Sequence, residues 1–259
     1  MGQGTISIRR RGRTVRVADL FRQMDYSARF EWGYEGVEHV GAASDMVVIV
    51  DVLSFTTCVD VVIGKGGVVF PYRMKDETAR SFARENQAIL AGKRGEEISL
   101  SPASLANVPE KTRIVLPSPN GSTCTVLAKR CGAIVIAASL RNASAVARFI
   151  RDQGGTVTVI ASGERWPNGT MRPAIEDMIA AGAILDELTE HTLSPEAQMA
   201  VGAFQMARGQ LVELLQKCGS GQELIQRGYP EDVAIASMYN SSDAVPILNH
   251  EDAYQAALT

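Results

Sequence analysis

The stretch SGERWPNGTMRPAIEDMIAAGAIL, residues 162–185, follows the apolar run TVTVIA at residues 156–161 and ends in small and aliphatic residues. A β-branched run bounded by turn residues is typical of a strand, and the apolar run after Asp177 is typical of a helix. This part of the chain therefore predicts a strand, a polar loop and a helix. The loop carries Glu164, Arg165 and Arg172, and the predicted helix opens with Glu176 and Asp177.

Carboxylates bind hard cations and guanidiniums bind oxyanions, so this loop suits a metal ion together with an anionic group. The alternative is that its arginines and glutamate pair with each other across a solvated loop. A similar order of strand, polar turn and helix recurs earlier in the chain, which favours the first interpretation.

The bulk composition narrows the class of protein. A chain of 259 residues, 46% hydrophobic and 21% charged, can form one large α/β core or two lobes. Its net charge of −3 argues against a general nucleic-acid-binding protein. No apolar run approaches the roughly 20 residues that span a bilayer, and no signal peptide follows the basic cluster at residues 9–13. The four cysteines lack metal-type spacing, which favours reduced thiols in a cytoplasmic protein.

Further strands are predicted at residues 46–51, 66–71, 113–116 and 133–136. The run MVVIV at residues 46–50 is apolar throughout, as in a strand buried on both faces of a sheet. The alternation of strands and helices predicts an α/β fold, with three α/β/α layers around a mostly parallel or mixed central sheet. We expect residues 28–259 to form this single domain, after an N-terminal hairpin extension in residues 1–27.

The sequence also predicts the structure of several connecting segments. Residues 28–44 are expected to form an entry loop with a short helix, and residues 75–90 an amphipathic helix. Residues 92–112 are expected to form a loop that folds over the crevice. We expect the helix near residues 194–217 either to pack in the core or to form a homodimer contact.

Polar residues follow the ends of the predicted strands, where α/β sheets bind their ligands. Asp51 ends the first buried strand, and Arg141 follows the strand at 133–136. Hydroxyls and backbone N–H groups at the following helix starts favour an anion, although helix capping alone is the alternative. The residues predicted to bind the substrate are Ser54, Thr56, Thr57, Ser118, Asn120, Gly121, Ser122, Thr123, Asn142 and Arg172.

Oxygen ligands with few histidines favour Mg²⁺ over zinc. The predicted metal ligands are Asp51, Glu164, Glu176 and Asp177. A divalent cation beside arginines and helix starts suits phosphoryl transfer, so the residues favour a Mg²⁺-dependent phosphatase with Asp51, Arg141 and Arg165 in catalysis. Three nucleophiles are open: water, Asp51, or a thiol at a helix start, Cys58 or Cys124.

The chain resembles the 2-phosphosulfolactate phosphatase (ComB-like) family in a series of short motifs from about residue 30 to about residue 250. The motifs are EWG at 31–33, DVLSFTT at 51–57, LSP at 100–102, SPNGS at 118–122, LRNA at 140–143, GER at 163–165, RPAIED at 172–177, AGA at 181–183, CGSGQEL at 218–224 and DV at 232–233. The resemblance implies an α/β/α fold and a Mg²⁺-dependent acid phosphatase. It also implies hydrolysis of 2-phospho-3-sulfolactate to 3-sulfolactate and phosphate, a step towards coenzyme M.

Two other functions fit the same residues. One is a phosphatase for another small phosphorylated hydroxy acid. The other is a non-catalytic protein that binds an anionic metabolite, against which the predicted metal ligands argue. A nucleotide-binding module is disfavoured, because no glycine-rich fingerprint with an acidic partner is present.

Overall fold

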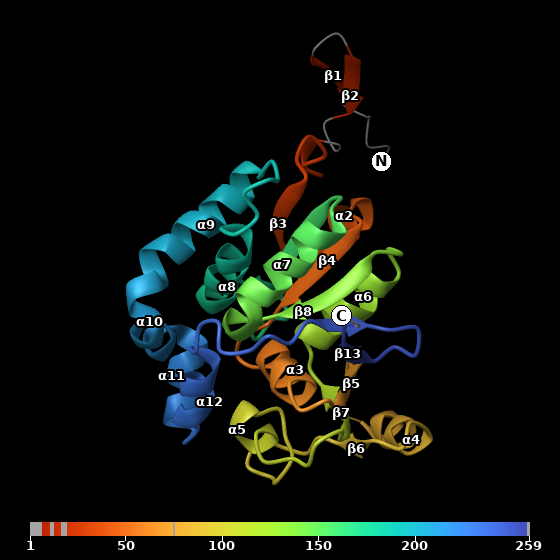
Figure 1. Cartoon of the computed structure of the whole chain (residues 1–259), viewed down its shortest axis with the longest axis vertical. Coiled ribbons are helices and arrows are strands. Elements are labelled where there is room, and N and C mark those ends of the chain that lie inside the picture. Colours follow the sequence, from red (N-terminus) through yellow and green to blue (C-terminus); the bar gives the residue numbers. More distant parts are fainter. Residues whose placement is uncertain (1–6, 11–12, 17–19, 75, 258–259) are drawn as a thin grey trace.

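The computed structural model describes residues 7–10, 13–16, 20–74 and 76–257 of the chain. Its main sheet has nine strands in the order β3-β9-β4-β8-β12-β13-β5-β7-β6 (Figure 1). Towards one edge, β9 (Val157–Ala161) and then β4 (Met46–Val50) follow the edge strand, and every residue of these two strands is buried. They pair in parallel with each other, and β4 also pairs in parallel with β8 (Ile134–Ala138). The prediction of a strand buried on both faces at 46–50 is confirmed.

A second parallel group lies at the other end of the sheet. There β7 (Arg113–Pro117) pairs in parallel with β5 (Val68–Tyr72) and with the short β6 (Ile89–Leu90). The antiparallel hairpin of β12 (Pro246–Leu248) and β13 (Tyr254–Ala256) joins the two groups, because β12 pairs with β8 and β13 pairs with β5. The sheet is therefore mixed, as the sequence predicted.

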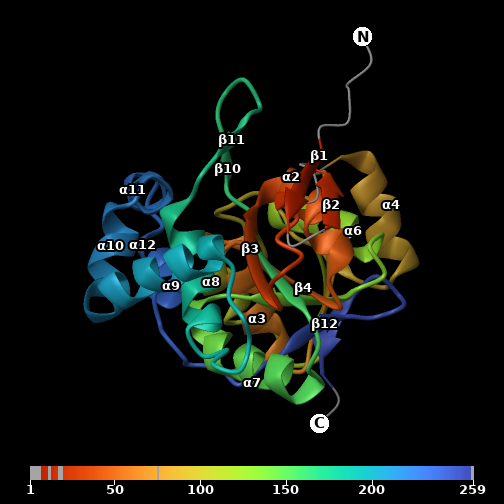
Figure 2. The same cartoon turned by 90° about the horizontal axis from the view of Figure 1, so that it is seen from above.

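Helices cover both faces of the sheet and complete the three layers. Alternate residues of β4 divide between two apolar cores, as expected for side chains that point to opposite faces of a strand. One core includes α7 (Ala143–Gln153), α8 (Ile175–Leu185) and α9 (Pro195–Ala207). The other includes α2 (Gly33–His39), α3 (Phe55–Ile63), α5 (Pro102–Leu105) and α6 (Gly121–Lys129). Figure 2 shows α8 and α9 on one side of β3 and β4, with α2 and α6 on the other.

The remaining helices follow in chain order. α4 (Glu77–Glu85) precedes β6, and the C-terminal third continues through α10 (Leu211–Lys217), α11 (Gly219–Gln226) and α12 (Pro230–Ala236). Short 3₁₀ turns lie at Gly41–Ala43, Leu140–Asn142 and Arg208–Gln210. Among the described residues, none of the helices has the length and apolar character that crossing a membrane requires.

Three expectations about connecting segments need correction. Residues 28–32 form β3 (Ala28–Trp32), an edge strand parallel to β9, rather than part of an entry loop. The helix expected at 75–90 ends at Glu85, because Gln87 adopts a φ of 51° and the chain then enters β6. The helix expected at 194–217 is divided by the 3₁₀ turn at Arg208–Gln210. The hairpin of β12 and β13 was not predicted.

The N-terminal hairpin is present as β1 (Ser7–Arg10) paired antiparallel with β2 (Arg13–Arg16). It forms a sheet of its own, separate from the main sheet (Figure 1). The outer ends of the hairpin expected around 5–17 fall at residues 5, 6 and 17, which lie outside the described residues. The division of the chain at residue 27 stays a prediction.

Candidate active site

Asp51 lies where the end of β4 meets the N-terminal ends of two helices. Its Oδ1 accepts a hydrogen bond from the Phe55 N–H of α3 at 3.2 Å, and its Oδ2 accepts one from the Gly121 N–H of α6 at 2.7 Å. A Cβ at position 121 would lie 2.7 Å from Asp51 Oδ2 and 2.4 Å from Phe55 Cδ1. Only glycine therefore allows α6 to begin against this carboxylate.

Asp177, in the first turn of α8, connects two strand ends. Its Oδ1 accepts a hydrogen bond from the Val52 N–H at 2.8 Å, and its Oδ2 accepts one from the Gly163 N–H at 2.9 Å. Val52 follows β4 and Gly163 follows β9, so one buried carboxylate fixes both turns. Asp51 and Asp177 thus each hold two backbone N–H groups that would otherwise be buried without partners.

We call the four predicted metal ligands, Asp51, Glu164, Glu176 and Asp177, the acid cluster. The Glu176 charge acts on the other three carboxyls, and the Asp51 charge acts on Glu164 and Asp177. Burial, with a contribution from the Glu176 charge, raises the pKa of Asp51 to about 6 against the hydrogen bonds from Phe55 and Gly121. Burial and the charges of Asp51 and Glu176 raise the pKa of Glu164 to about 7. The same causes raise the pKa of Asp177 well above its ordinary value. The cluster therefore concentrates negative charge in a buried place.

The carboxylates of the acid cluster suit Mg²⁺, which usually keeps some water ligands, better than a metal ion that is coordinated by protein side chains alone. Among the described residues, no three His, Cys, Asp or Glu side chains are arranged as a ready-made metal site. Mg²⁺ commonly binds one or two carboxylates and completes its shell with water and substrate oxygens. The buried Asn120 side chain donates from Nδ2 to Glu164 Oε2 at 2.9 Å, which leaves its amide oxygen Oδ1 without a hydrogen-bond partner. That oxygen is a further hard donor beside the carboxylates.

Three of the six predicted substrate-binding hydroxyls bond to the backbone instead. Thr56 and Thr57 donate to the carbonyl oxygens of Asp51 and Val52, at 2.8 and 2.7 Å. Ser122 likewise donates to Leu116 at 3.0 Å. These hydroxyls secure the turns, so binding through them is not what the structure favours.

The start of α6 offers N–H groups in their place. No side chain caps α6, and helix geometry leaves the N–H groups of Ser122 and Thr123 without intrahelical partners. Ser118 Oγ lies 3.5 Å from Asp51 Oδ2 at the same turn. The anion site expected at residues 118–123 stays a prediction, and the backbone N–H groups rather than the hydroxyls are its available donors.

Arg141 and Asn142 do not join the acid cluster. Arg141 Nε donates to Asp60 Oδ2 of α3 at 2.7 Å, in a nearly buried ion pair. The Asn142 side chain accepts from the Ser139 N–H at 2.8 Å and donates to the Ala244 carbonyl at 3.0 Å. The 3₁₀ turn after β8 directs both side chains to structural partners, since a buried Asp60 carboxylate requires one. The structure thus gives no support to the predicted catalytic role of Arg141 or to substrate binding by Asn142.

Arg165 and Arg172 lie on a small hairpin formed by β10 (Glu164–Arg165) and β11 (Met171–Arg172), which projects from the body in Figure 2. The Arg165 guanidinium lies over the ring of Tyr34, 3.8 Å from its centroid. Arg172 Nη2 donates to Ser220 Oγ of α11 at 3.3 Å. The Arg172 guanidinium also lies over the ring of Trp166, at 5.9 Å from its centroid. Arg172 is the cross-strand partner of Glu164, and its charge lowers the pKa of that carboxyl, so an interaction with Glu164 accompanies these contacts.

The two thiols proposed as nucleophiles are fully buried. Burial raises the pKa of Cys124 to about 12 and that of Cys58 well above its ordinary value. A neutral thiol is a poor nucleophile. The electrostatics of these positions therefore disfavour a phosphocysteine and leave water and Asp51.

Comparison with known proteins identifies the family. The family model described as 2-phosphosulpholactate phosphatase matches residues 34–251. The chain belongs to this family. The match contains the whole acid cluster and the start of α6, and it confirms the resemblance expected from about residue 30 to about residue 250.

Curated relatives in the 2-phosphosulpholactate phosphatase family align over most of their length. A probable 2-phosphosulfolactate phosphatase from Gloeobacter violaceus is 29% identical over 214 residues, which cover 78% of this chain and 87% of the relative. A protein of the same name from Carboxydothermus hydrogenoformans is also 29% identical, over 79% of this chain and 87% of the relative. One from Thermus thermophilus is 28% identical, over 82% and 90%.

Two residues of this family member were not predicted as part of the site. Arg94 pairs with Asp232 of α12, and its Nη2 donates to Ser54 Oγ at 3.2 Å, beside the turn after Asp51. The segment at 92–112 thus reaches the site, as expected, but through a residue that was not named. Tyr34, at the start of α2, contacts Arg165 and donates to the Pro119 carbonyl. The motifs LSP at 100–102 and DV at 232–233 lie next to the Arg94 contacts, and they were the signal in the sequence that could have indicated this part of the site.

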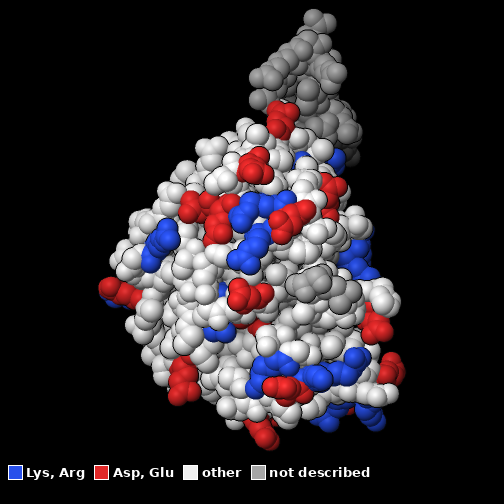
Figure 3. Space-filling model, in the orientation of Figure 1, with Lys and Arg blue, Asp and Glu red and all other residues white. Residues whose placement is uncertain are grey.

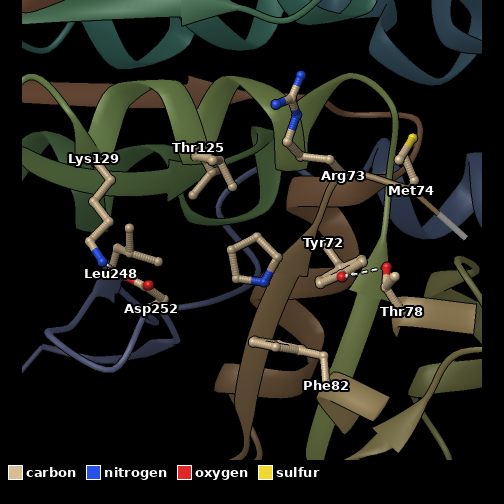
Figure 4. Close-up of a pocket in the computed structure, with 11 residues that line it drawn as sticks. Tyr72, Arg73, Met74, Thr78, Phe82, Thr125, Lys129, Leu248 and Asp252 are labelled. Atoms are coloured by element: carbon tan, nitrogen blue, oxygen red, sulfur yellow. Dashed lines mark hydrogen bonds and ion pairs between the residues drawn. The ribbon is translucent and has the colours of Figure 1, made fainter. Parts of the chain in front are cut away.

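A cavity of about 340 Å³ lies apart from the acid cluster (Figure 4). It is bounded by the end of β5, by α4 and α6, and by the hairpin of β12 and β13. Its walls are mainly apolar, Lys129 pairs with Asp252 at one end, and Tyr72 and Thr78 share a hydrogen bond. Because no acid-cluster residue lines it, this cavity does not carry the chemistry expected of the family.

Proposed function

We propose that the chain is a Mg²⁺-dependent phosphoric monoester hydrolase that converts 2-phospho-3-sulfolactate to 3-sulfolactate and phosphate. One observation carries the proposal: the start of α6 meets Asp51 and the rest of the acid cluster, with Arg165 alongside. A site for a phosphate dianion thus adjoins a site for a divalent cation. The family match and the names of the curated relatives support the choice of substrate.

In this proposal one or two of the carboxylates of Asp51, Glu164 and Glu176 would hold Mg²⁺, together with the unpartnered amide oxygen of Asn120. Bound there, the ion would neutralise the carboxylates and polarise the phosphoryl oxygens. Asp177 belongs to the same acid cluster, but both of its oxygens accept backbone hydrogen bonds. Its main role in this proposal is to hold the turns after β4 and β9 together.

The phosphoryl group would lie at the start of α6. The N–H groups of Ser122 and Thr123 and the Arg165 guanidinium are donors for its oxygens, and they match the charge that develops during transfer. Water would form a new bond to phosphorus while the bond between phosphorus and the C2 oxygen breaks, and the C2 oxygen would take up a proton that the water gives up, to leave 3-sulfolactate and phosphate. Asp51 is the weaker nucleophile, because hydrogen bonds from Phe55 and Gly121 draw charge from both of its oxygens.

Arg172 is the candidate for the sulfonate or carboxylate of the substrate, because its hydrogen bond is with the Ser220 hydroxyl. Arg94 is paired with Asp232, as Arg141 is with Asp60, and so is less available to an anion. Guanidiniums bind such planar or tetrahedral anions through several N–H groups at once.

A phosphatase for a hydroxy acid without a sulfonate is the second candidate. One observation favours it: Arg141, expected to bind an anion, is paired with Asp60 instead. A smaller number of available guanidiniums suits a substrate with fewer acid groups.

Phosphate release from a panel of esters tests both candidates. The panel contains 2-phospho-3-sulfolactate, 2-phospholactate and 2-phosphoglycolate, each assayed with Mg²⁺ and with EDTA. The first proposal predicts Mg²⁺-dependent release with the highest kcat/KM on the sulfonated ester. A preference for 2-phospholactate supports the second, and release that is equal with EDTA contradicts the role of the ion.

A further inference from the structure

One aromatic ring connects two parts of the candidate active site. Tyr34 is the second residue of α2, directly after β3, and its ring lies 3.8 Å from the Arg165 guanidinium carbon. Its hydroxyl donates a hydrogen bond to the carbonyl oxygen of Pro119, in the turn that leads into α6. The ring therefore joins the hairpin that carries Arg165 to the turn that presents the proposed phosphate-binding N–H groups.

Arg165 has an unused hydrogen-bond donor. Its Nη2 is buried and has no partner, while Nη1 donates to the Gly169 carbonyl at 3.4 Å. A buried N–H of a charged group without a partner is costly, and an oxyanion would satisfy it. The Arg165 charge also acts on Cys124, in the first turn of α6, where it lowers the pKa that burial raises.

The neighbouring arginines are held differently. Arg141 is fixed by the Asp60 carboxylate and Arg94 by the Asp232 carboxylate. Arg172 is tied to Ser220. Arg94 and Arg172 also lie over rings, those of Tyr229 and Trp166, at 5.5 and 5.9 Å. Arg165 lies closer to its ring, at 3.8 Å, and this contact fixes the plane of the guanidinium without neutralising its charge.

We propose that Tyr34 is a positioning residue for phosphate: its ring fixes the Arg165 guanidinium, and its hydroxyl ties that arginine to the turn at Pro119. The inference rests on the proposed function for the identity of the anion. It adds a residue that contributes to phosphate affinity through Arg165 and not by touching the substrate.

The test measures binding of inorganic phosphate in the presence of Mg²⁺, by calorimetry on the full chain. The proteins are the wild type, Tyr34→Leu, Tyr34→Phe, Tyr34→Trp, Arg165→Ala and the Tyr34→Leu/Arg165→Ala double variant. We expect Tyr34→Leu to weaken phosphate binding about tenfold, while variants that keep a ring lose about threefold or less. In the Arg165→Ala background, Tyr34→Leu should add less than about twofold, since both act through one contact.

Arg208→Ala is the matched control, because Arg208 lies over the ring of Phe204 at 6.0 Å, away from the acid cluster, and should leave binding unchanged. Wild-type affinity in Tyr34→Leu, an equal loss in both backgrounds, or no phosphate binding by the wild type would overturn the inference. Phosphate binding that follows the expected pattern, in a protein that hydrolyses none of the esters, would leave the inference intact and remove the proposed function.

Discussion

The N–H of Gly121 lies 2.7 Å from Asp51 Oδ2, although the two residues are 70 positions apart in the chain. This hydrogen bond brings the start of α6 to the end of β4 and so joins the proposed anion site to the proposed metal site. It requires glycine, because a Cβ would meet both the Asp51 carboxylate and the Phe55 ring.

Replacement of Gly121 by alanine should separate α6 from Asp51. We expect kcat/KM for phosphate release to fall by about 10²-fold, as for the loss of an oriented donor. The free energy of unfolding should fall by about 1–3 kcal/mol, as for overpacking in a core. Gly209→Ala is the control, since nothing lies within 4 Å of a Cβ at that position. Full activity in Gly121→Ala would show that the contact is dispensable.

Asp51→Asn keeps the shape of the side chain but removes its charge. Activity should fall by about 10³-fold or more if Asp51 holds the ion, while circular dichroism remains that of the wild type. One amide hydrogen would face a backbone N–H, because both Asp51 oxygens accept hydrogen bonds, and this should cost about 1–3 kcal/mol of stability. Steady-state kinetics and urea unfolding measure the two effects; retained hydrolysis removes Asp51 from the site.

Replacing Arg141 should lower mainly the stability of the protein, whereas replacing Arg165 should lower mainly its activity. Arg141→Ala leaves the buried Asp60 without its partner, so we expect a loss of about 3 kcal/mol in stability with kcat/KM within about threefold of wild type. Arg165→Ala should change stability by less than about 1 kcal/mol but lower kcat/KM by about 10²-fold. Urea unfolding beside steady-state kinetics separates them. The reverse pattern would restore Arg141 to the site predicted from sequence.

Mg²⁺ binding should depend on pH. Burial raises the pKa of Asp51 to about 6 and that of Glu164 to about 7, above the ordinary values of the unfolded chain. A carboxyl whose pKa is raised on folding makes its full contribution to stability below its pKa in the unfolded chain. That contribution is lost as the pH rises through its pKa in the folded protein. Without metal, stability should therefore decline from about pH 4 to about pH 7.

Since Mg²⁺ binds the ionised carboxylates, its stabilising effect should grow over the same interval and level off above it. The rise in Tm on adding saturating Mg²⁺, against an EDTA control, measures this at pH 5, 6, 7 and 8. An equal rise at every pH would mean that the ion does not displace protons from the acid cluster.

The buried parallel strands were predictable from composition. Short runs of valine and isoleucine such as residues 46–50 are typical of a strand buried on both faces. The edge strand β3 was missed because it contains Arg29, whose guanidinium is buried and donates to the carbonyls of Tyr26 and Ala43. The strands β12 and β13 have three residues each, too few for a periodic signal.

The candidate site, like the fold, contains some residues that the sequence could predict and others that it could not. The acid cluster was predictable because each acid directly follows a strand or opens a helix, and local order alone places such residues at one edge of a sheet. The partner of Arg141 was not, because Asp60 is brought to it by the packing of α3 against the turn after β8. The contributions of Tyr34 and Arg94 depend likewise on contacts between distant segments.

On the face of the molecule seen in Figure 3, basic and acidic side chains of the described residues are interleaved. This distribution accords with the low net charge of the chain. The expectations that the protein binds no nucleic acid, that it is cytoplasmic and that it forms a homodimer stay predictions.

A crystal structure of the protein with Mg²⁺ and inorganic phosphate tests the central claim most directly. We predict an octahedral ion about 2.1 Å from an Asp51 oxygen and from Asn120 Oδ1, with phosphate on the N–H groups of Ser122 and Thr123 and on Arg165 Nη2. Phosphate bound beside Arg141 instead, with no ion at the acid cluster, would contradict the account.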